Sequence, residues 1–137
     1  ETRPNVLEEA RRELLESKLA DKMPMLLSED ISSVSLDRKF DYVWAHSVLI
    51  HLTNEKLEDC FEFVSSNLGE QGKCYANVNI GNRKDDSWQG FPVIWRTLDS
   101  YKEMGSSHGL TVEDIGSRQE FGLEYQDSHR MLKISKK

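Results

Sequence analysis

The sequence has 137 residues, a formal net charge of −6, 37% hydrophobic residues and 31% charged residues. A chain of this length and apolar content can bury the core of one domain, which excludes a disordered protein. The acidic balance argues against sequence-independent nucleic-acid binding, which needs a basic face, and no apolar run reaches the roughly 20 residues of a membrane span. We therefore expect a cytoplasmic protein whose partners include neither nucleic acid nor a membrane.

The first part of the chain predicts a helix, a short strand and a loop. Pro4 suits the first turn of a helix, and the apolar residues after it recur at helical spacing. Residues 25–27 form a short apolar run, which predicts a strand that ends near Asp30. The next segment, residues 31–39, is expected to be a loop.

The centre of the chain predicts a βαβ unit. Phe40–Ala45 is expected to be a strand, and residues 54–68 an amphipathic helix capped by Thr53 or Asn54. A glycine-bounded turn then leads into a strand over residues 73–80. A crossover of this kind makes the sheet at least partly parallel.

The carboxyl end of the first strand in this unit is where a ligand is expected. Open parallel sheets bind their ligands at the carboxyl ends of the strands. Here that end is Ala45, followed by His46, Ser47 and Val48. Any chemistry should be sought there first.

The last part of the chain predicts a loop, a helix and two strands. Residues 81–92 are polar and rich in turn formers, but they carry Trp88 and Phe91. Thr97 can cap a helix that ends at His108, where a glycine follows. Two further strands and the long loop between them complete the chain: residues 110–115, 116–128 and 130–135.

Cys60 and Cys74 are the only cysteines. One lies on a helix face and the other in a strand, and they lack the spacing of metal ligands. Both are expected to be reduced core residues, and no metal site is expected.

Three phrases in the central part of the chain occur in a distinctive order. They are FDYV (residues 40–43), HSVLIHL (residues 46–52) and LGEQGK (residues 68–73). Together they resemble the fourth strand, and the turn into the fifth strand, of class I S-adenosylmethionine-dependent methyltransferases, which commonly read F-D-x-V, V-L-x-H-L and L-x-P-G-G-x. This chain has Glu70-Gln71 where Pro-Gly is usual, so the last phrase matches in part.

The amino terminus carries a further resemblance to the same family. ETRPNVLEEA (residues 1–10) resembles the exit of the family's second strand, commonly D/E-x-S-P-x-x-L-x-x-A, with Arg3 where a capping Ser is common. The chain then begins after the family's first strand and glycine-rich loop, and no G-x-G-x-G sequence occurs in it. We expect either a fragment of a longer protein or a truncated homologue, forming a single truncated domain over residues 1–137.

The resemblance covers essentially the whole chain and implies a fold. That fold is α/β: a partial Rossmann-like methyltransferase fold, with a mostly parallel sheet, an antiparallel last strand and helices on both faces. The family's sheet order is 3-2-1-4-5-7-6. Without the first strand, the edge of Phe40–Ala45 would be exposed, which makes self-association possible.

The resemblance also implies S-adenosyl-L-methionine as the cofactor. In that interpretation Glu1 accepts hydrogen bonds from the ribose hydroxyls, Asp30 accepts from the adenine amino group, and the Ile31 amide donates to a ring nitrogen. His46 would contact the cofactor chiefly through its backbone, and Val48 would pack on the adenine or, equally, on the next helix. The alternative for Asp30 is a residue that caps its own loop.

The residues expected to bind or activate the methyl acceptor are aromatic residues and histidines. Trp88, Phe91 and Tyr125 fall in segments that cover the substrate in this family, and they form either a pocket wall or a separate apolar cluster. His46 and His51 are candidate bases, although His51 can equally be a structural link from strand to helix. The remaining histidines, His108 and His129, are interpreted as structural or surface residues.

The function that follows is methyl transfer to an oxygen, nitrogen or carbon of a small molecule in the intact protein, with this chain inactive alone. A second interpretation is a non-catalytic methyltransferase-like module that serves interactions. A nicotinamide-binding fold fits the HSVLIHL phrase poorly. The methyl acceptor is left open, because a fold does not fix a function.

Overall fold

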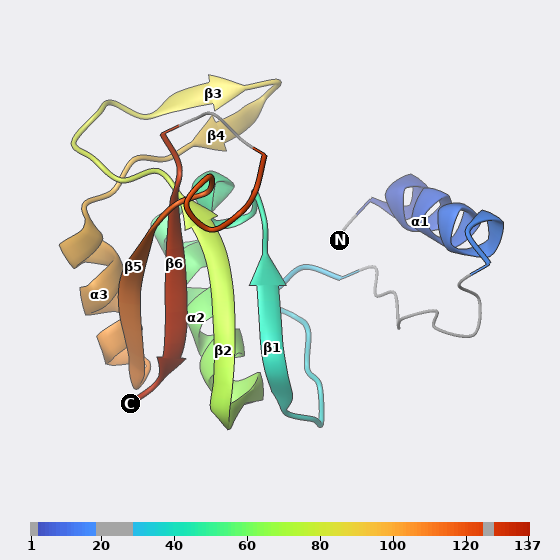
Figure 1. Ribbon diagram of the computed structural model, residues 1–137, viewed down its shortest axis with the longest axis horizontal. Coiled ribbons are helices and arrows are strands. Elements are labelled where there is room, and N and C mark those ends of the chain that lie inside the picture. Colours follow the sequence, from blue (N-terminus) through green and yellow to red (C-terminus); the bar gives the residue numbers. More distant parts are fainter. Residues whose placement is uncertain (1–2, 19–28, 125–127) are drawn as a thin grey trace. The chain divides into compact units, whose positions relative to one another are not determined.

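The computed structural model describes residues 3–18, 29–124 and 128–137, and the chain divides into two compact units (Figure 1). The first unit is Glu1–Val34 and the second is Ser35–Lys137. That the whole chain forms one truncated domain stays a prediction.

The first unit contains the predicted amino-terminal helix, α1 (Pro4–Glu16). Its proline lies in the first turn, and Arg3 precedes the helix without a side-chain cap, as the sequence suggested. Arg12 pairs with Glu9 and, at 2.7 Å, with Glu16 along the exposed face. The strand predicted for residues 25–27 lies outside the described residues.

The second unit is built on a four-stranded sheet in the order β1-β2-β6-β5. β1 (Phe40–Ala45) pairs in parallel with β2 (Leu68–Val78). β6 (Arg130–Lys136) is antiparallel to β2 and to β5 (Leu110–Ser117), between which it lies. Three strands therefore run in one direction, and the last strand in the sequence runs against them (Figure 1), which confirms the predicted mixed sheet.

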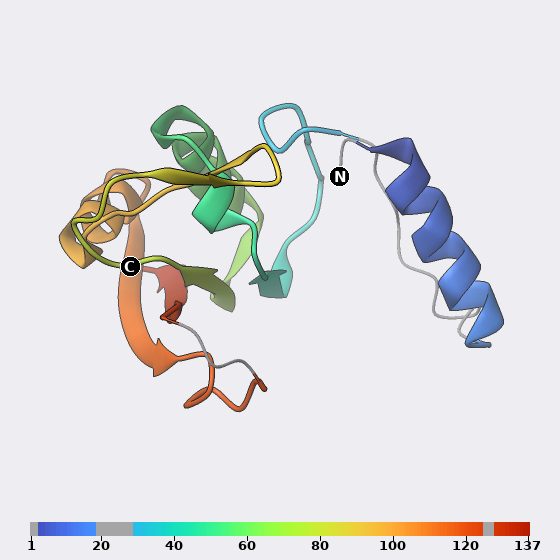
Figure 2. The ribbon, with the colours of Figure 1, turned by 90° about the horizontal axis from the view of Figure 1, so that it is seen from above.

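Two helices cover one face of this sheet. α2 (Asn54–Asn67) and α3 (Leu98–Ser107) lie on the same side of it in both ribbon views (Figures 1 and 2). Each begins at a predicted cap, since the hydroxyls of Thr53 and Thr97 accept hydrogen bonds from the third residue after them, at 3.4 and 3.2 Å. Helices on both faces stay a prediction, because α1 belongs to the other unit.

The core lies between these helices and the sheet. Its largest fully buried side chains include both aromatic and aliphatic residues: Tyr101, Phe61, Leu49, Leu57, Leu68, Leu110, Met131, Leu132 and Ile134.

The predicted glycine-bounded turn between α2 and the next strand is wrong. β2 begins at Leu68, immediately after α2, and the register against β1 shifts between the pairs Phe40↔Leu68 and Tyr42↔Lys73. The extra residues form an irregularity within the strand. A Cβ on Gly72 would stand 2.7 Å from the Phe40 carbonyl oxygen, so glycine allows the close approach there, and a Pro-Gly turn is not needed.

The segment predicted to be a loop contains a hairpin. β3 (Asp86–Trp88) and β4 (Phe91–Val93) pair antiparallel. Gln89 and Gly90 join them with positive φ values of 48° and 84°, the backbone of a two-residue hairpin turn. The hairpin is absent from the sequence-based prediction because Gln-Gly is a weaker turn signal than Asn-Gly.

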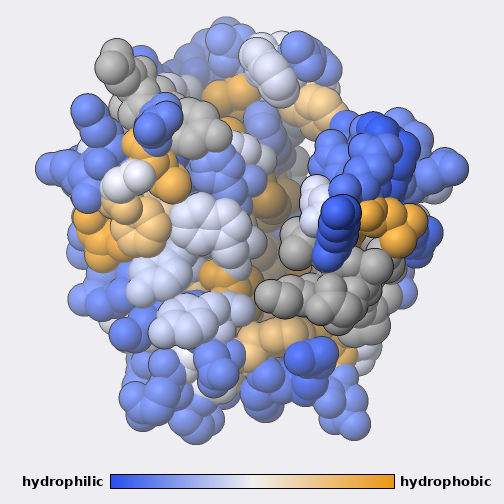
Figure 3. All heavy atoms as spheres, turned by 45° about the vertical axis from the view of Figure 1, so that its right-hand side comes forward, coloured by the Kyte–Doolittle hydropathy of each residue, from blue (hydrophilic) through white to orange (hydrophobic). Residues whose placement is uncertain are grey.

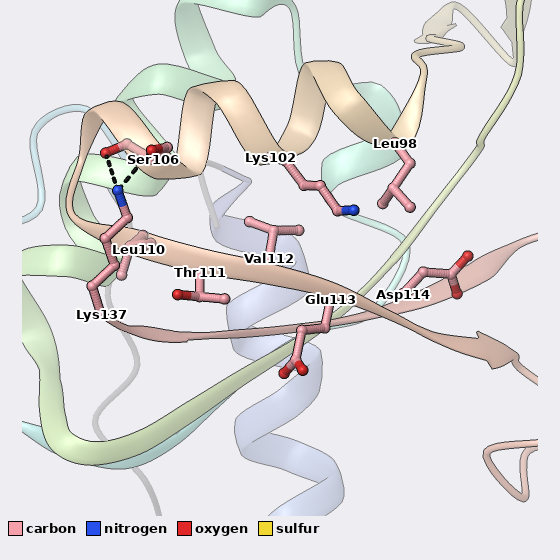
Figure 4. Close-up of a pocket in the computed structure, with 9 residues that line it drawn as sticks. All are labelled: Leu98, Lys102, Ser106, Leu110, Thr111, Val112, Glu113, Asp114 and Lys137. Carbon is pink, nitrogen blue, oxygen red and sulfur yellow. Dashed lines mark hydrogen bonds between the residues drawn. The ribbon is translucent and has the colours of Figure 1, made fainter.

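A groove of about 600 Å³ runs between α3 and β5 at the outer edge of the sheet (Figure 4). Leu98, Leu110 and Val112 supply apolar side chains to it, and the Lys137 ammonium closes one end by binding the Ser106 hydroxyl and carbonyl. The groove contains none of the predicted site residues.

Candidate functional site

The carboxyl ends of β1 and β2 lie side by side, where the sequence placed the chemistry. The register pairs Ala45 with Ala76, so the residues that follow each strand emerge together. After Ala45 the chain turns through His46, Ser47 and Val48 before a short 3-10 helix, η2 (Leu49–His51). Ser47 has a φ of 55°, a left-handed conformation that non-glycine residues rarely adopt.

A buried asparagine holds this turn. Asn77 of β2 is fully buried, and its side-chain oxygen accepts a 2.5 Å hydrogen bond from the Ser47 amide. Its side-chain nitrogen lies 3.0 Å from Nδ1 of His129. An amide nitrogen can only donate, so Nδ1 of His129 accepts and carries no proton.

A second link joins the turn to the loop after β5. Arg118 is buried, and its Nη1 lies 3.0 Å from Nε2 of His46. The guanidinium can only donate, so Nε2 of His46 accepts. His46 also stacks on Trp44, with ring centroids 6.0 Å apart.

The two histidines of this cluster are held neutral. Burial first, and then the charge of Arg118, lowers the pKa of His46 below its usual value. The same two causes, with smaller contributions from His46 and His51, lower the pKa of His129 to about 4. At neutral pH both rings therefore act as uncharged hydrogen-bonding groups.

His51 is the second candidate base, and it lies under the hairpin. Its Nδ1 is 2.6 Å from the carbonyl oxygen of Pro92, so Nδ1 carries a proton, and in the neutral form of the ring Nε2 is the proton acceptor. The ring lies 5.8 Å from that of Phe91, and a backbone bond from Ile94 to Ile50 fastens the hairpin to η2. The interpretation of His51 as a link between elements is compatible with these contacts.

Aromatic side chains stand exposed near these groups. Trp88 and Phe91 form a cross-strand pair on the hairpin and are 57% and 43% exposed.

A second group of aromatic side chains lies on the sheet. Phe121 stacks on Trp44 and contacts Tyr75, with ring centroids 6.0 and 5.4 Å apart. Figure 3 shows pale side chains, the colour of tyrosine and tryptophan on its scale, gathered together with orange and blue ones around them. Tyr125, the third predicted substrate residue, lies outside the described residues.

The predicted cofactor residues fall in different units. Asp30 and Ile31 belong to the first unit, while His46 and Val48 belong to the second. Oδ1 of Asp30 accepts hydrogen bonds from the amide and hydroxyl of Ser32, at 3.0 and 2.6 Å, so the loop-capping alternative is present in the structure. Glu1 lies outside the described residues. Val48 is 45% exposed beside the turn.

Sequence reasoning missed Asn77, Arg118 and His129 as members of this cluster. The residues in these contacts are separated by 30, 52 and 72 positions along the chain. No local sequence motif predicts pairs that are so far apart. The one signal available was Asn77 itself, a polar residue inside an apolar strand, because a buried amide needs partners.

Two further observations concern only the described ranges 3–18, 29–124 and 128–137. No group of three or more histidine, cysteine or acidic side chains is placed to hold a metal ion. No helix in them is long and apolar enough to cross a membrane.

The sheet order and the comparisons with solved structures identify the fold. The order β1-β2-β6-β5 reproduces the 4-5-7-6 half of the expected 3-2-1-4-5-7-6 sheet. An S-adenosylmethionine-dependent methyltransferase from Clostridium acetobutylicum ATCC 824 is similar over 98% of this chain and 72% of its own, at 14% identity and a TM-score of 0.76. The chain has the fold of these methyltransferases.

Two other solved structures show the same methyltransferase fold with different acceptors in their names. The glycopeptide N-methyltransferase MtfA, complexed with S-adenosylmethionine, matches 100% of this chain and 75% of its own, at 16% identity and a TM-score of 0.74. The mitomycin 7-O-methyltransferase MmcR matches 98% of this chain but 40% of its own, at 16% identity and a TM-score of 0.74. No protein-family model matches the sequence, and no curated protein does.

Proposed function

We propose that this chain is the methyltransferase-fold part of an enzyme that transfers a methyl group from S-adenosylmethionine to a small molecule. The observation that carries the proposal is the polar cluster at the carboxyl ends of β1 and β2, at the place where this fold class binds ligands. The similar solved structures support it, since they include an O- and an N-methyltransferase.

The turn after β1 has a composition that fits the cofactor. Val48 offers an exposed apolar side chain suited to the flat face of an adenine, and neutral His46 adds no repulsion toward a positively charged sulfur. When bound, S-adenosylmethionine would supply a methyl group that is attached to a positively charged sulfur. A lone pair of the acceptor would take this methyl group. In the first unit, Asp30 and Ile31 are the proposed adenine contacts, and Glu1 the proposed ribose contact.

Between the two candidate bases, the hydrogen bonds favour His51. Nε2 of His46 accepts from Arg118, whereas the bond from Nδ1 of His51 to Pro92 leaves Nε2 of His51 as an acceptor. A base is needed only for acceptors that lose a proton, such as hydroxyl groups. The exposed pair Trp88 and Phe91 would provide an apolar wall for the acceptor beside that ring.

Titration with S-adenosylhomocysteine, followed by NMR, tests cofactor binding. In the ¹⁵N-labelled chain we expect the amide signals of His46 and Val48 to shift in a saturable way. The affinity should be weak, because the sequence has no G-x-G-x-G. Two or three missing hydrogen bonds of about 1.5–3 kcal/mol each weaken binding on the order of a thousandfold.

Matched variants and ligands give this titration its controls. Val48→Asp should weaken binding, whereas Trp88→Asp, a similar change at an exposed hairpin position, should leave it unchanged. NADH should not produce the same shifts. Absence of any saturable shift at His46 and Val48 would contradict the proposal.

That outcome would favour the second candidate, a non-catalytic interaction module. One observation speaks for such a module: the aromatic side chains Trp44 and Tyr42 on β1 are exposed. A module would show no response to the cofactor product and would keep its fold when Val48 is changed.

A further inference from the structure

The turn after β1 has a backbone conformation that something must hold. Ser47 has a φ of 55°, although serine has a Cβ that disfavours the left-handed region. Residues kept in such regions persist only when their surroundings determine the conformation. The relevant surroundings are the hydrogen bonds that reach this turn.

The first of these bonds depends on how one side-chain amide is oriented. The Ser47 amide donates to Oδ1 of Asn77 at 2.5 Å, which requires that oxygen, and not the amide nitrogen, to face the turn. Asn77 lies in β2 opposite Met131 of β6 and is fully buried, so its position is fixed by the strand. Rotating its amide by half a turn would place a donor against a donor.

His129 sets that orientation from the other side. Its Nδ1 lies 3.0 Å from Nδ2 of Asn77 and, as a neutral ring nitrogen, accepts from it. His129 directly precedes β6, which pairs with β2, so the sheet itself brings the ring to Asn77. The contact runs from His129 through Asn77 to the Ser47 amide.

From this chain of contacts we infer that His129 is a positioning residue for the turn His46–Val48. Its unprotonated Nδ1 orients the Asn77 amide, and Asn77 in turn holds Ser47 in the left-handed conformation that presents His46 and Val48. The inference deepens the proposed function and rests on it, since that turn is the proposed cofactor contact. The bond from Arg118 to His46 holds the same turn at a second point.

Charged and titratable groups around His129 keep the ring in this state. Arg118 from the loop after β5, His46 from the β1 turn and His51 from η2 all lower its pKa, after burial, which contributes most. The ring therefore stays neutral across the physiological range, and the positioning is permanent.

Two substitutions at His129 separate its hydrogen bond from its bulk. His129→Leu removes the acceptor and keeps an apolar side chain, whereas His129→Asn places an amide oxygen near the position of Nδ1. In the ligand-free chain, His129→Leu should speed hydrogen exchange of the Ser47 amide about tenfold, the loss of one modest hydrogen bond. His129→Asn should restore most of the protection.

Two further measurements complete the test in the ligand-free chain: the ¹⁵N spectrum of the His129 ring and a control substitution at another histidine. The ¹⁵N shift of His129 Nδ1 should show an unprotonated acceptor at neutral pH. His108→Leu, at a histidine that contacts α2 instead, should leave Ser47 exchange unchanged. Equal Ser47 exchange in the wild type and His129→Leu, or a protonated Nδ1, would overturn the inference.

Measuring the affinity for S-adenosylhomocysteine distinguishes a failure of this inference from a failure of the proposed function. S-adenosylhomocysteine affinity should fall about tenfold in His129→Leu and return in His129→Asn. If the wild-type chain shows no binding, the proposed function fails and Ser47 exchange alone decides the positioning. If the wild type binds and His129→Leu binds equally well, the positioning inference fails and the proposed function stands.

Discussion

His108 and His129 show how strongly the neighbours of a residue decide its chemistry. Both were interpreted from the sequence as structural or surface residues. His129 faces Arg118, and burial together with that charge lowers its pKa to about 4. Burial also tends to lower the pKa of His108, but the hydrogen bonds that its ring donates to the carboxylates of Glu58 and Glu62 outweigh this effect and raise the pKa. One ring is therefore a fixed neutral acceptor, and the other is a cation at mildly acidic pH.

The His108 contacts predict a pH-dependent contribution to stability. Its Nε2 and Nδ1 lie 2.5 and 3.1 Å from carboxylate oxygens of Glu58 and Glu62, which ties the end of α3 to α2. Because the pKa is raised in the folded chain, the contribution is complete below the unfolded value of about 6.5 and is lost as pH rises through the folded value. His108→Gln should lower the free energy of unfolding by about 1 kcal/mol at mildly acidic pH.

Urea denaturation of both chains at about pH 5.5 and about pH 9 checks this sign. The difference between wild type and His108→Gln should shrink at the higher pH. Lys56→Gln removes an exposed pair with Asp59 that contains no histidine, so its effect should be the same at both pH values. A His108 effect that grows with pH would contradict the assignment.

The two cysteines give a second prediction at this scale. Cys60 and Cys74 are free and buried, and burial chiefly raises their thiol pKa values to about 11 and about 12. The thiolate is the reactive form, so both should resist a disulfide reagent such as DTNB at mildly alkaline pH. Rapid reaction of both is expected only in urea, and fast labelling of the folded chain would contradict the burial.

At the scale of elements, the sequence predicted regular structure well and irregular structure poorly. β1 and the two capped helices appear where apolar periodicity and the threonines Thr53 and Thr97 placed them, because those signals are local. The close approach of Gly72 to Phe40 and the hairpin turn at Gln89 depend on tertiary packing or on a weak turn pair. The sequence therefore predicted a turn where a strand begins, and a loop where a hairpin forms.

The contact between α3 and β5 carries a prediction of its own. A Cβ on Gly105 would stand 2.5 Å from Cγ2 of Val112, so this glycine lets the helix approach the strand. In a helix exposed to solvent, Gly→Ala usually stabilises by up to about 1 kcal/mol. Here we expect Gly105→Ala to destabilise by about 1–3 kcal/mol, because the packed strand cannot easily retreat.

A double variant shows whether the contact causes the loss. Val112→Ala removes the clashing methyl groups, so Gly105→Ala in that background should cost much less, or even stabilise. Urea denaturation of the four chains gives the coupling free energy. Additive effects of the two substitutions would rule out the contact as the cause.

At the scale of the molecule, the order of phrases along the chain predicted the half-sheet 4-5-7-6, because each phrase marks one strand or helix. At the carboxyl ends of β1 and β2, the sequence analysis named only His46, Val48 and His51, which lie within or beside a phrase, and their roles stay predictions. Asn77 and Arg118 join it through contacts between distant parts of the chain, which a single sequence does not display. The order of elements is therefore easier to predict than the side chains that meet at their ends.

The outer edge of β1 leads to a prediction about association. Within the described residues of the second unit, β1 pairs only with β2, and Tyr42 on this strand is 72% exposed. An unpaired edge with apolar side chains invites pairing with another strand. We propose that the chain self-associates through this edge as its concentration rises, and sedimentation velocity over a wide concentration range measures it.

A charge at the edge should prevent that pairing. Tyr42→Lys brings two ammonium groups together whenever two β1 strands meet, and lysine is a common guard of natural sheet edges. Trp88→Lys places the same charge on the hairpin, where an aromatic side chain is similarly exposed, and should leave the association unchanged. If the wild type stays monomeric at all concentrations, or if Trp88→Lys is the variant that disperses it, the β1 edge is not the interface.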